Sequence, residues 1–220
     1  MKRLIGRLTL LAALLTLAGC ASHPAATDSA RTGPFFTPRN FRADVRLAPG
    51  LMRVVLLPVH GGLVASAQTV EGMDALFVEA LEHQSRFEVV TLSREECAKT
   101  FGVPDVGSTD ELPHDFLKIL ADKFDAQGVL FVDLTAYAAY RPLTLGLRAK
   151  LATVGDRRMA WSFDEVFSTS NPNIVNSVRH FYLHNELGSV PVDLTTDALQ
   201  SPNSFAAYAA DAMFRTLPAR

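Results

Sequence analysis

The first half of the hydrophobic pattern predicts a parallel sheet with helical connections. Residues 52–59 form an almost unbroken run of β-branched and aliphatic side chains, which is typical of a central strand covered on both faces. Apolar residues then recur at helical spacing from Met73 to Leu81, which predicts a helix with one apolar stripe. Residues 87–92 (FEVVTL) supply a second strand. Strand, helix and strand in this order predict a right-handed βαβ unit.

Two further helices and a third strand continue the parallel part. A capping-box pattern from Ser93 to Glu96 predicts a short helix around Cys97. A loop rich in proline, glycine and aspartate spans residues 102–110, and an amphipathic helix follows it. That helix leads into residues 128–134, another buried-looking run that predicts a third strand.

From residue 143 onward the pattern is typical of antiparallel strands. Residues 143–152 alternate between apolar and polar, so we expect one face of this strand to be buried and the other to be wet. The turn Gly155-Asp156 connects it to residues 159–167, where Glu165 interrupts the alternation and indicates a β-bulge. The third, fourth and fifth strands are therefore predicted to form an antiparallel meander.

The C-terminal part of the pattern predicts helices. Residues 173–184 have helical periodicity, residues 188–200 are irregular, and Ser201-Pro202 supplies the cap and first-turn proline of a last helix. The predicted order of elements is β-α-β-α-β-β-β, followed by helices. This order predicts a mixed α/β fold, with a mixed sheet of about five strands and C-terminal helices packed on it.

The N-terminus predicts a lipoprotein signal peptide. Basic residues among the first seven precede an uncharged run over residues 8–19, which is shorter than the about 20 residues that a membrane-spanning helix needs. The run ends in Leu-Ala-Gly-Cys at residues 17–20, which resembles a bacterial lipobox. We therefore expect cleavage before Cys20 and attachment of diacylglycerol to its thiol. Cys20 is then a lipid anchor and neither a nucleophile nor a metal ligand.

Composition and charge narrow the function classes. The 220 residues include 21 Lys and Arg against 23 Asp and Glu, and 48% are hydrophobic, which excludes a disordered chain and a basic nucleic-acid-binding protein. Removing residues 1–19 moves the formal charge from −2 to −5, so acyl chains rather than charge must hold the protein at a membrane. The residues directly after the cysteine include no Asp, which favours export to the outer membrane by resemblance to other bacterial lipoproteins. After lipidation Cys97 has no partner for an intramolecular disulfide.

We expect three parts along the chain. Residues 1–19 are the signal peptide, and residues 20–48 are a lipid-anchored flexible tether that is broken by proline and glycine. The phenylalanines between residues 35 and 41 indicate that the far end of this tether packs back on the domain. Residues 49–220 form a single α/β domain with a C-terminal helical extension.

Few residues offer chemistry, and we favour structural roles for them. His180 and His184 have the i, i+4 spacing that can place two imidazoles on one metal, but no third ligand is evident, so we favour surface or half-buried histidines. Asp133 follows a buried run and is either a perturbed carboxylate in a cleft or, as we favour, a residue that caps a turn or pairs with a base such as Arg148.

Other motifs add no catalytic site. Tyr137, Tyr140 and Arg141 form either an exposed aromatic surface or ordinary cross-strand packing. The sequence has neither a Gly-x-Ser-x-Gly elbow nor a Gly-x-x-x-x-Gly-Lys phosphate loop, so hydrolysis by those routes has no support. We expect no catalytic residues, no cofactor and no metal.

Several segments resemble a known group of envelope lipoproteins. Besides the helix through Leu81, they are RVVLLP at 53–58, SRFEVV at 85–90, DAQGVLFV at 125–132 and VGDRRMAWS at 154–162. The chain resembles the group that includes the curli-secretion lipoprotein CsgG, the flagellar lipoprotein FlgO, the penicillin-binding-protein activator LpoB and the TolB amino-terminal domain. The resemblance implies an anticodon-binding-domain-like fold and partners in secretion, flagellar or cell-wall machinery.

The chain departs from this group in two places. The links between the third, fourth and fifth strands are too short for the amphipathic hairpins of the curli channel, so pore formation does not carry over. The segments 102–110 and 188–200 do not map onto the group's pattern and are candidates for a partner-specific surface.

The expected function is that of a non-enzymatic envelope protein. We expect a periplasmic lipoprotein, anchored to the outer membrane by lipid on Cys20, that binds envelope proteins or its own copies and no nucleic acid. The alternating strand over Leu143–Leu151 is the edge that we expect to accept another chain. The alternatives are a small-ligand or peptidoglycan-binding module with a pocket near Asp133 and the loop after His60, and an uncharacterised hydrolase.

Overall fold

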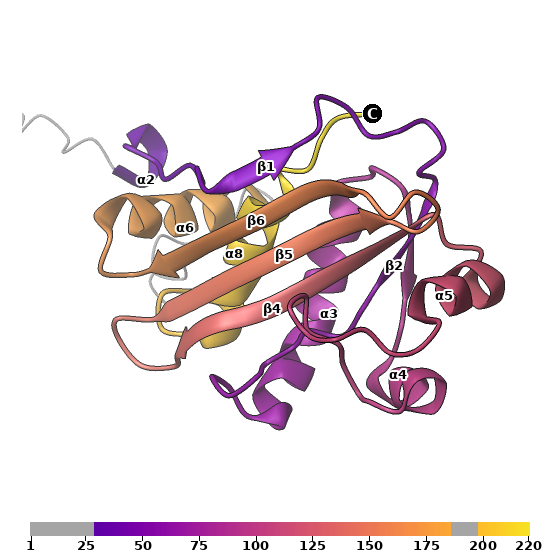
Figure 1. Ribbon diagram of the computed structural model, residues 1–220. Helices are drawn as coiled ribbons and strands as arrows, with labels where there is room; N and C mark the ends of the chain where they lie inside the picture. Colours follow the sequence, from indigo (N-terminus) through magenta and orange to yellow (C-terminus); the bar gives the residue numbers. More distant parts are fainter. Residues whose placement is uncertain (1–28, 186–197) are drawn as a thin grey trace, which may run out of the picture.

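A six-stranded mixed sheet forms the centre of the protein, in the computed structural model that describes residues 29–185 and 198–220 (Figure 1). The strands lie in the spatial order β1-β6-β5-β4-β2-β3. Strand β2 is parallel to β3 and β4, and the other neighbours are antiparallel. The strands are β1 (Phe41–Ala43), β2 (Arg53–Leu56), β3 (Glu88–Thr91), β4 (Gly128–Ala138), β5 (Thr144–Thr153) and β6 (Met159–Ser168). The predicted mixed α/β fold is confirmed, with one strand more than expected.

Helices cover the two faces of the sheet unequally. Helices α3, α6 and α8 pack on one face through a large apolar cluster. Helices α4 and α5 pack through a smaller cluster on the other face, at the end formed by β2 and β4, so in the described part of the chain no helix covers that face of β5 and β6 (Figure 1). The helices are α2 (Ser29–Thr32), α3 (Ala67–His83), α4 (Arg94–Phe101), α5 (Phe116–Phe124), α6 (Pro172–Asn185) and α8 (Pro202–Phe214).

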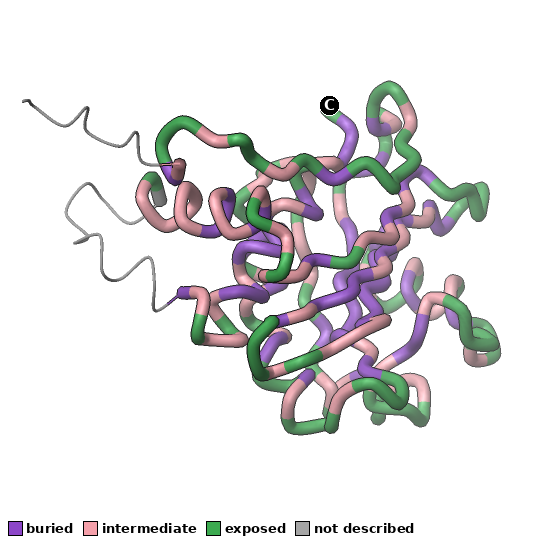
Figure 2. The backbone as a smooth tube through the Cα atoms, turned by 90° about the vertical axis from the view of Figure 1, so that its left-hand side faces the viewer, coloured by how far each residue is buried: buried purple, intermediate pink, exposed green. Residues whose placement is uncertain are grey.

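Aromatic side chains of β6 fix the position of α8 on the sheet. The rings of Trp161 and Phe163 stack with centroids 6.0 Å apart, and Phe167 meets Tyr208 of α8 edge to face, also at 6.0 Å. The indole N–H of Trp161 donates to the hydroxyl of Thr216, 3.0 Å away, just beyond the end of α8. Figure 2 shows that buried residues lie in the sheet and in the helices packed on it, whereas exposed residues lie mainly in the connecting loops.

The antiparallel meander is confirmed, but the predicted β-bulge at Glu165 is wrong. Glu165 pairs regularly with Leu147, and the irregularities lie instead between Leu134 and Ala136 and next to Leu151. A carboxylate occupies this position because it accepts hydrogen bonds from the main-chain N–H groups that lead into β1. The polar residue therefore marks a tertiary contact rather than a change of register.

The predicted docking edge is also wrong. Strand β5, which contains most of Leu143–Leu151, pairs with β4 on one side and β6 on the other. Its alternation reflects a strand with one buried and one open face inside the sheet, because that pattern does not distinguish central from edge strands. The sheet ends at β1 and β3.

Part of the predicted tether belongs to the folded domain. Within residues 29–48, α2 packs on α6, β1 pairs with β6, and Phe36 packs against the large apolar cluster. The predicted signal peptide, residues 20–28 of the tether and most of the irregular segment 188–200 lie outside the described residues. Among the helices that the structure describes, none combines the length and apolar character needed to cross a bilayer.

Candidate interaction groove

A groove lies beside β1 on the helical face of the sheet. It encloses about 590 Å³ between residues 35–41, α6 and α8, and we call it the β1 groove. Its volume lies in the range of ordinary ligand-binding pockets, about 300–1,000 Å³. Its aromatic walls are formed by Phe35, Phe36, Phe41, Phe181 and Tyr208. Such walls favour apolar or aromatic side chains as occupants.

The wall at residues 35–41 depends on a sharp turn after α2. Gly33 has φ +80°, a conformation that glycine adopts without the steric cost of a side chain, and its N–H donates to the carbonyl of Ser29 at 2.9 Å. The chain then crosses α6, where the N–H of Phe36 donates to the hydroxyl of Ser177 at 2.8 Å. The ring of Phe35 packs on that of His180, with centroids 4.4 Å apart.

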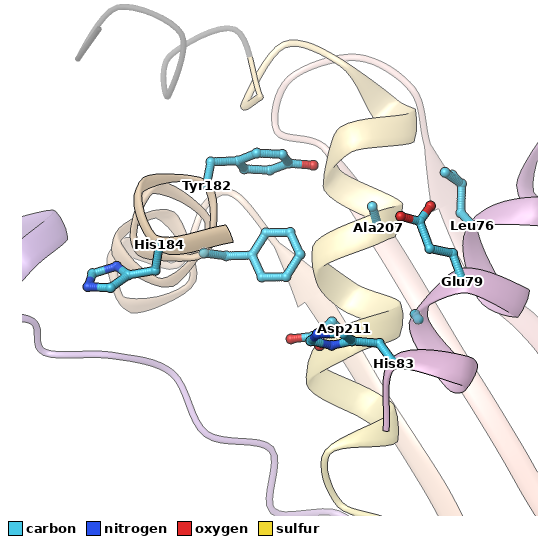
Figure 3. Close-up of a pocket in the computed structure, with 9 residues that line it drawn as sticks. Leu76, Glu79, His83, Tyr182, His184, Ala207 and Asp211 are labelled. Atoms are coloured by element: carbon cyan, nitrogen blue, oxygen red, sulfur yellow. The ribbon is translucent and has the colours of Figure 1, made fainter. Parts of the chain in front are cut away.

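A second hollow lies on the other side of α6. It encloses about 540 Å³ between α6, α8 and α3. Figure 3 shows Tyr182, Ala207 and His83 around it, with His184 on the outer side of α6 and pointing away from α8. Asp211 of α8 lines both hollows, so it lies at the boundary between them.

Asp211 is a buried carboxylate whose charge is compensated. Its residue is 4% exposed, and it lies 2.9 Å from Nε of Arg215, while Gln84 donates to it at 3.3 Å. His83 approaches at 3.9 Å. Burial raises the pKa of Asp211, and the neighbouring Arg215 opposes this shift. The carboxylate is thus held by α3 and by its own helix.

Tyr208 places a buried hydroxyl at the base of the β1 groove. The residue is 5% exposed, and burial raises its pKa to about 12. The hydroxyl lies beside Ser177, which acts against that shift, but it makes no hydrogen bond of ordinary geometry within the described residues. A buried hydroxyl without a good partner is destabilising, and that of Tyr208 is enclosed beneath the wall of the groove.

Asp133 has the structural role that we favoured. It is 5% exposed and accepts hydrogen bonds from the N–H of Ser108, at 2.9 Å, and from the Ser108 hydroxyl. Lys150 donates to the carbonyl of the same serine at 2.7 Å. Asp133 therefore caps a turn of the loop 102–110. The proposed pairing with Arg148 is wrong, because Arg148 donates to Asp164 at 2.8 Å.

An ionic network beside Asp133 was missed by the sequence analysis. Arg94 donates to Asp74 at 2.8 and 3.0 Å, to Asp105 at 2.7 Å and to the carbonyl of Val59 at 2.6 Å. Nδ1 of His60 lies 2.6 Å from the other oxygen of Asp105. These partners come from separate segments, and no spacing along the chain signals them. Together with the loop 102–110 they occupy the place where a pocket near Asp133 and His60 was expected.

Both histidines of the pair lie on α6, where His180 is half-buried and His184 is exposed. The rings of His180 and His184 are 4.0 Å apart, and their Nδ1 atoms face the carbonyls of Ala30 and His180 at 3.0 and 2.9 Å. In the part of the chain that the structure describes, no three His, Cys, Asp or Glu side chains gather as metal ligands would. The pair contributes to the packing of α2 on α6.

The other singled-out residues lie apart. Tyr137 packs partly against the large apolar cluster, whereas Tyr140 is 88% exposed, so the two do not form one surface. Cys97 is buried, and desolvation raises its pKa to about 11, which fits an inert thiol. Cys20 lies outside the described residues.

Only one feature of the sequence points to the groove, namely an acidic residue within an otherwise apolar helix. Helix α8 is apolar almost all round and contains a single acidic residue, Asp211. A carboxylate in such a helix predicts a buried charge with a partner, and Arg215 follows it at i+4. The walls at residues 35–41 and α6 lie far from α8 in sequence, so no spacing connects them.

Comparison with known proteins gives similarity in fold. Neither a protein-family model nor a curated protein matches the chain. Among solved structures, PelC from Paraburkholderia phytofirmans, solved as a dodecamer, has a TM-score of 0.43 and 12% identity, covering 82% of this chain and 96% of that one. Lipoprotein GNA1162 from Neisseria meningitidis has a TM-score of 0.40 and 16% identity, covering 61% and 98%. The LpoB C-terminal domain from Salmonella enterica has a TM-score of 0.37 and 17% identity, covering 55% and 87%. The structural neighbours thus include members of the envelope-lipoprotein group that the sequence resembles.

Proposed function

We propose that the protein is a periplasmic lipoprotein, anchored to the outer membrane through Cys20, that acts without catalysis as an interaction or assembly factor in envelope biogenesis. The observation that carries this proposal is the β1 groove, which lies beside an edge strand of the sheet. An aromatic groove next to a strand edge is a common arrangement for binding polypeptides. The charged network around Arg94 is internally paired and fits a structural role better than a catalytic one.

The position of the groove agrees with lipid anchoring. Residues 20–28 connect the predicted lipid site to α2, and nine residues span at most about 30 Å when fully extended. Helix α2 packs on α6, which forms one wall of the β1 groove. A lipid on Cys20 would therefore keep the groove close to the membrane and raise its effective concentration for partners there.

In-cell crosslinking tests the proposed function. The full-length protein is crosslinked in its own bacterium, purified and analysed by mass spectrometry, with Cys20→Ala as the unanchored control. We expect defined envelope proteins, or further copies of this chain, to be captured with the anchored protein and lost with the control. If the same proteins are captured by wild type and by Cys20→Ala, the lipid anchor plays no part in partner binding. A chain that is crosslinked to nothing, while soluble ligands copurify with it, supports a ligand-binding module instead.

A further inference from the structure

We propose that the β1 groove binds an extended, acidic segment of a partner polypeptide, which adds to the sheet along the outer edge of β1 and places bulky apolar side chains in the groove. This inference rests on the proposed function and specifies the chemistry of the partner. Three observations carry it, namely the register of β1, the form of the groove and the charge around the edge.

The register of β1 leaves main-chain groups available at the edge. The N–H of Asp44 donates to Ala160, and that of Asp164 donates to Asn40, so hydrogen-bonded pairs recur at every second residue. Arg42, which pairs with Ser162, belongs to this set. The N–H and C=O groups of the alternate residues, Phe41 and Ala43, therefore point away from β6. Because β1 is the outermost strand at this end of the sheet in the described residues, an extended chain can bind there as a further strand.

The groove lies on the side that an added strand would face. Phe41 pairs with Phe163, whose side chain is buried in the cluster on the helical face, and Phe41 itself lines the groove. Alternate side chains of an added strand would point to that same face. They would meet the aromatic walls of the groove. Bulky apolar side chains at every second position fit this arrangement.

The charge around β1 selects an acidic partner. Residues 29–48 contain four arginines, all exposed, against Asp44 as the one acidic residue, although the whole chain is net negative. Asp44 is paired with Arg158. At the opposite wall of the groove, the charge of Arg215 is offset by its ion pair with Asp211. The basic residues are Arg31, Arg39, Arg42 and Arg46. Binding should therefore weaken as salt screens these charges.

The other end of the sheet is less suited to an added strand. A hollow also lies beside β3, and Arg220 is one of the residues that line it. Its guanidinium donates to the carbonyls of Arg86 and Leu51. The chain's own C-terminal residue thus already binds beside β3, whereas no residue of the described ranges occupies the hollow at β1.

Peptide selection on the full-length protein tests the inference. The protein is purified in detergent micelles and used to select from a phage-displayed library of random twelve-residue peptides. We expect enrichment of sequences with Asp or Glu and with large apolar residues two positions apart. Synthetic versions should bind several-fold more weakly when NaCl is raised from 50 to 500 mM, as expected for screened charges.

Matched variants locate the binding. Ala43→Pro removes an outward N–H without removing a bond to β6, and Ala43→Val retains that N–H. Ala212→Phe fills the β1 groove, whereas Ala207→Phe fills the second hollow from the same helix (Figure 3). We expect affinity to fall about tenfold or more for Ala43→Pro and Ala212→Phe, and to change less than about twofold for their controls. Circular dichroism and thermal melts show whether each variant is folded, and each of the two pairs tests the site independently.

Other outcomes overturn the inference. The inference fails if the library yields no peptide, if it yields basic peptides, or if a selected peptide binds all four variants equally. It also fails if the protein self-associates and Ala43→Pro dissociates it, because the edge of β1 then binds a second copy of this chain. If cellular partners are captured equally by wild type, Ala43→Pro and Ala212→Phe, the proposed function stands and this inference fails. If selected peptides bind as expected but no anchored partner exists in cells, the proposed function fails instead.

Discussion

The N–H of Phe36 donates a hydrogen bond to the hydroxyl of Ser177, 2.8 Å away and 141 residues later in the chain. This bond fixes the segment before β1 on α6 and thereby holds one wall of the β1 groove. The segment is short of buried apolar residues, so single polar contacts matter more for its position than they would in the core.

Replacing Ser177 with alanine should loosen this wall. The Phe36 N–H then loses its acceptor, and we expect the free energy of unfolding to fall by about 1 kcal/mol. Hydrogen exchange should speed up at residues 33–38 and stay unchanged in β4. Ser170→Ala, at an exposed serine, is the control and should change stability by less than about 0.5 kcal/mol. Unchanged exchange at residues 33–38 in Ser177→Ala would show that other contacts hold the wall.

The buried carboxylate of Asp211 should make stability fall as pH rises. Its pKa in the folded protein is raised above the ordinary value of 3.8, chiefly by burial, so the folded state binds the proton more tightly than the unfolded state. The contribution of Asp211 is therefore most favourable below pH 3.8 and is lost as pH rises through its folded pKa. In Asp211→Asn this contribution is absent.

Urea unfolding of wild type and Asp211→Asn between about pH 3.5 and pH 5.5 measures this effect. The difference in free energy of unfolding should move in favour of the variant as pH rises. Glu79→Gln, at another acidic residue beside the same hollow, should show no such trend. A difference that moves in favour of wild type would mean that Arg215 and Gln84 stabilise the carboxylate more than burial opposes it.

The ionic network around Arg94 should contribute more than an exposed ion pair of similar length. The Arg94 side chain is 16% exposed and contacts Asp74 and Asp105, so removing it leaves two carboxylates without their cation. We expect Arg94→Met to lower the free energy of unfolding by about 2 kcal/mol or more. Lys99→Met, in the exposed pair with Glu95 at 2.6 Å, should cost less than about 0.5 kcal/mol. Chemical denaturation of both variants compares them, and equal effects would contradict a special role for the network.

Burial explains why some strands could be predicted and others could not. Strand β2 alternates between the two apolar clusters, with Val54 in one and Val55 in the other, so both faces are apolar and the run is visible in the sequence. Strand β1 is three residues long and all of them are exposed, so it leaves no periodic pattern. It exists because β6 pairs with it and Glu165 binds the residues before it, and neither contact is local.

The candidate site depended on tertiary contacts in the same way. The role of Asp133 followed from its place after a buried run, because a carboxylate there needs nearby donors, and Ser108 supplies them. The β1 groove did not follow, since its walls come from residues 35–41 and from two helices near the C-terminus. Its edge strand was expected at β5, because alternation alone does not show whether a strand has one neighbour or two.

Gly146 should be intolerant of any side chain, and this prediction tests the register of the central strands. It pairs with Ala136 next to the irregularity in β4, and a Cβ at this position would lie 2.8 Å from the main-chain nitrogen of Ala136. Because the clash involves main chain, Gly146→Ala should lower the free energy of unfolding by about 2 kcal/mol. Gly155→Ala, where a Cβ would meet nothing within 4 Å, is the control and should change it by less than about 0.5 kcal/mol. Similar values for the two variants in urea unfolding would place Gly146 outside the tight pairing of β4 and β5.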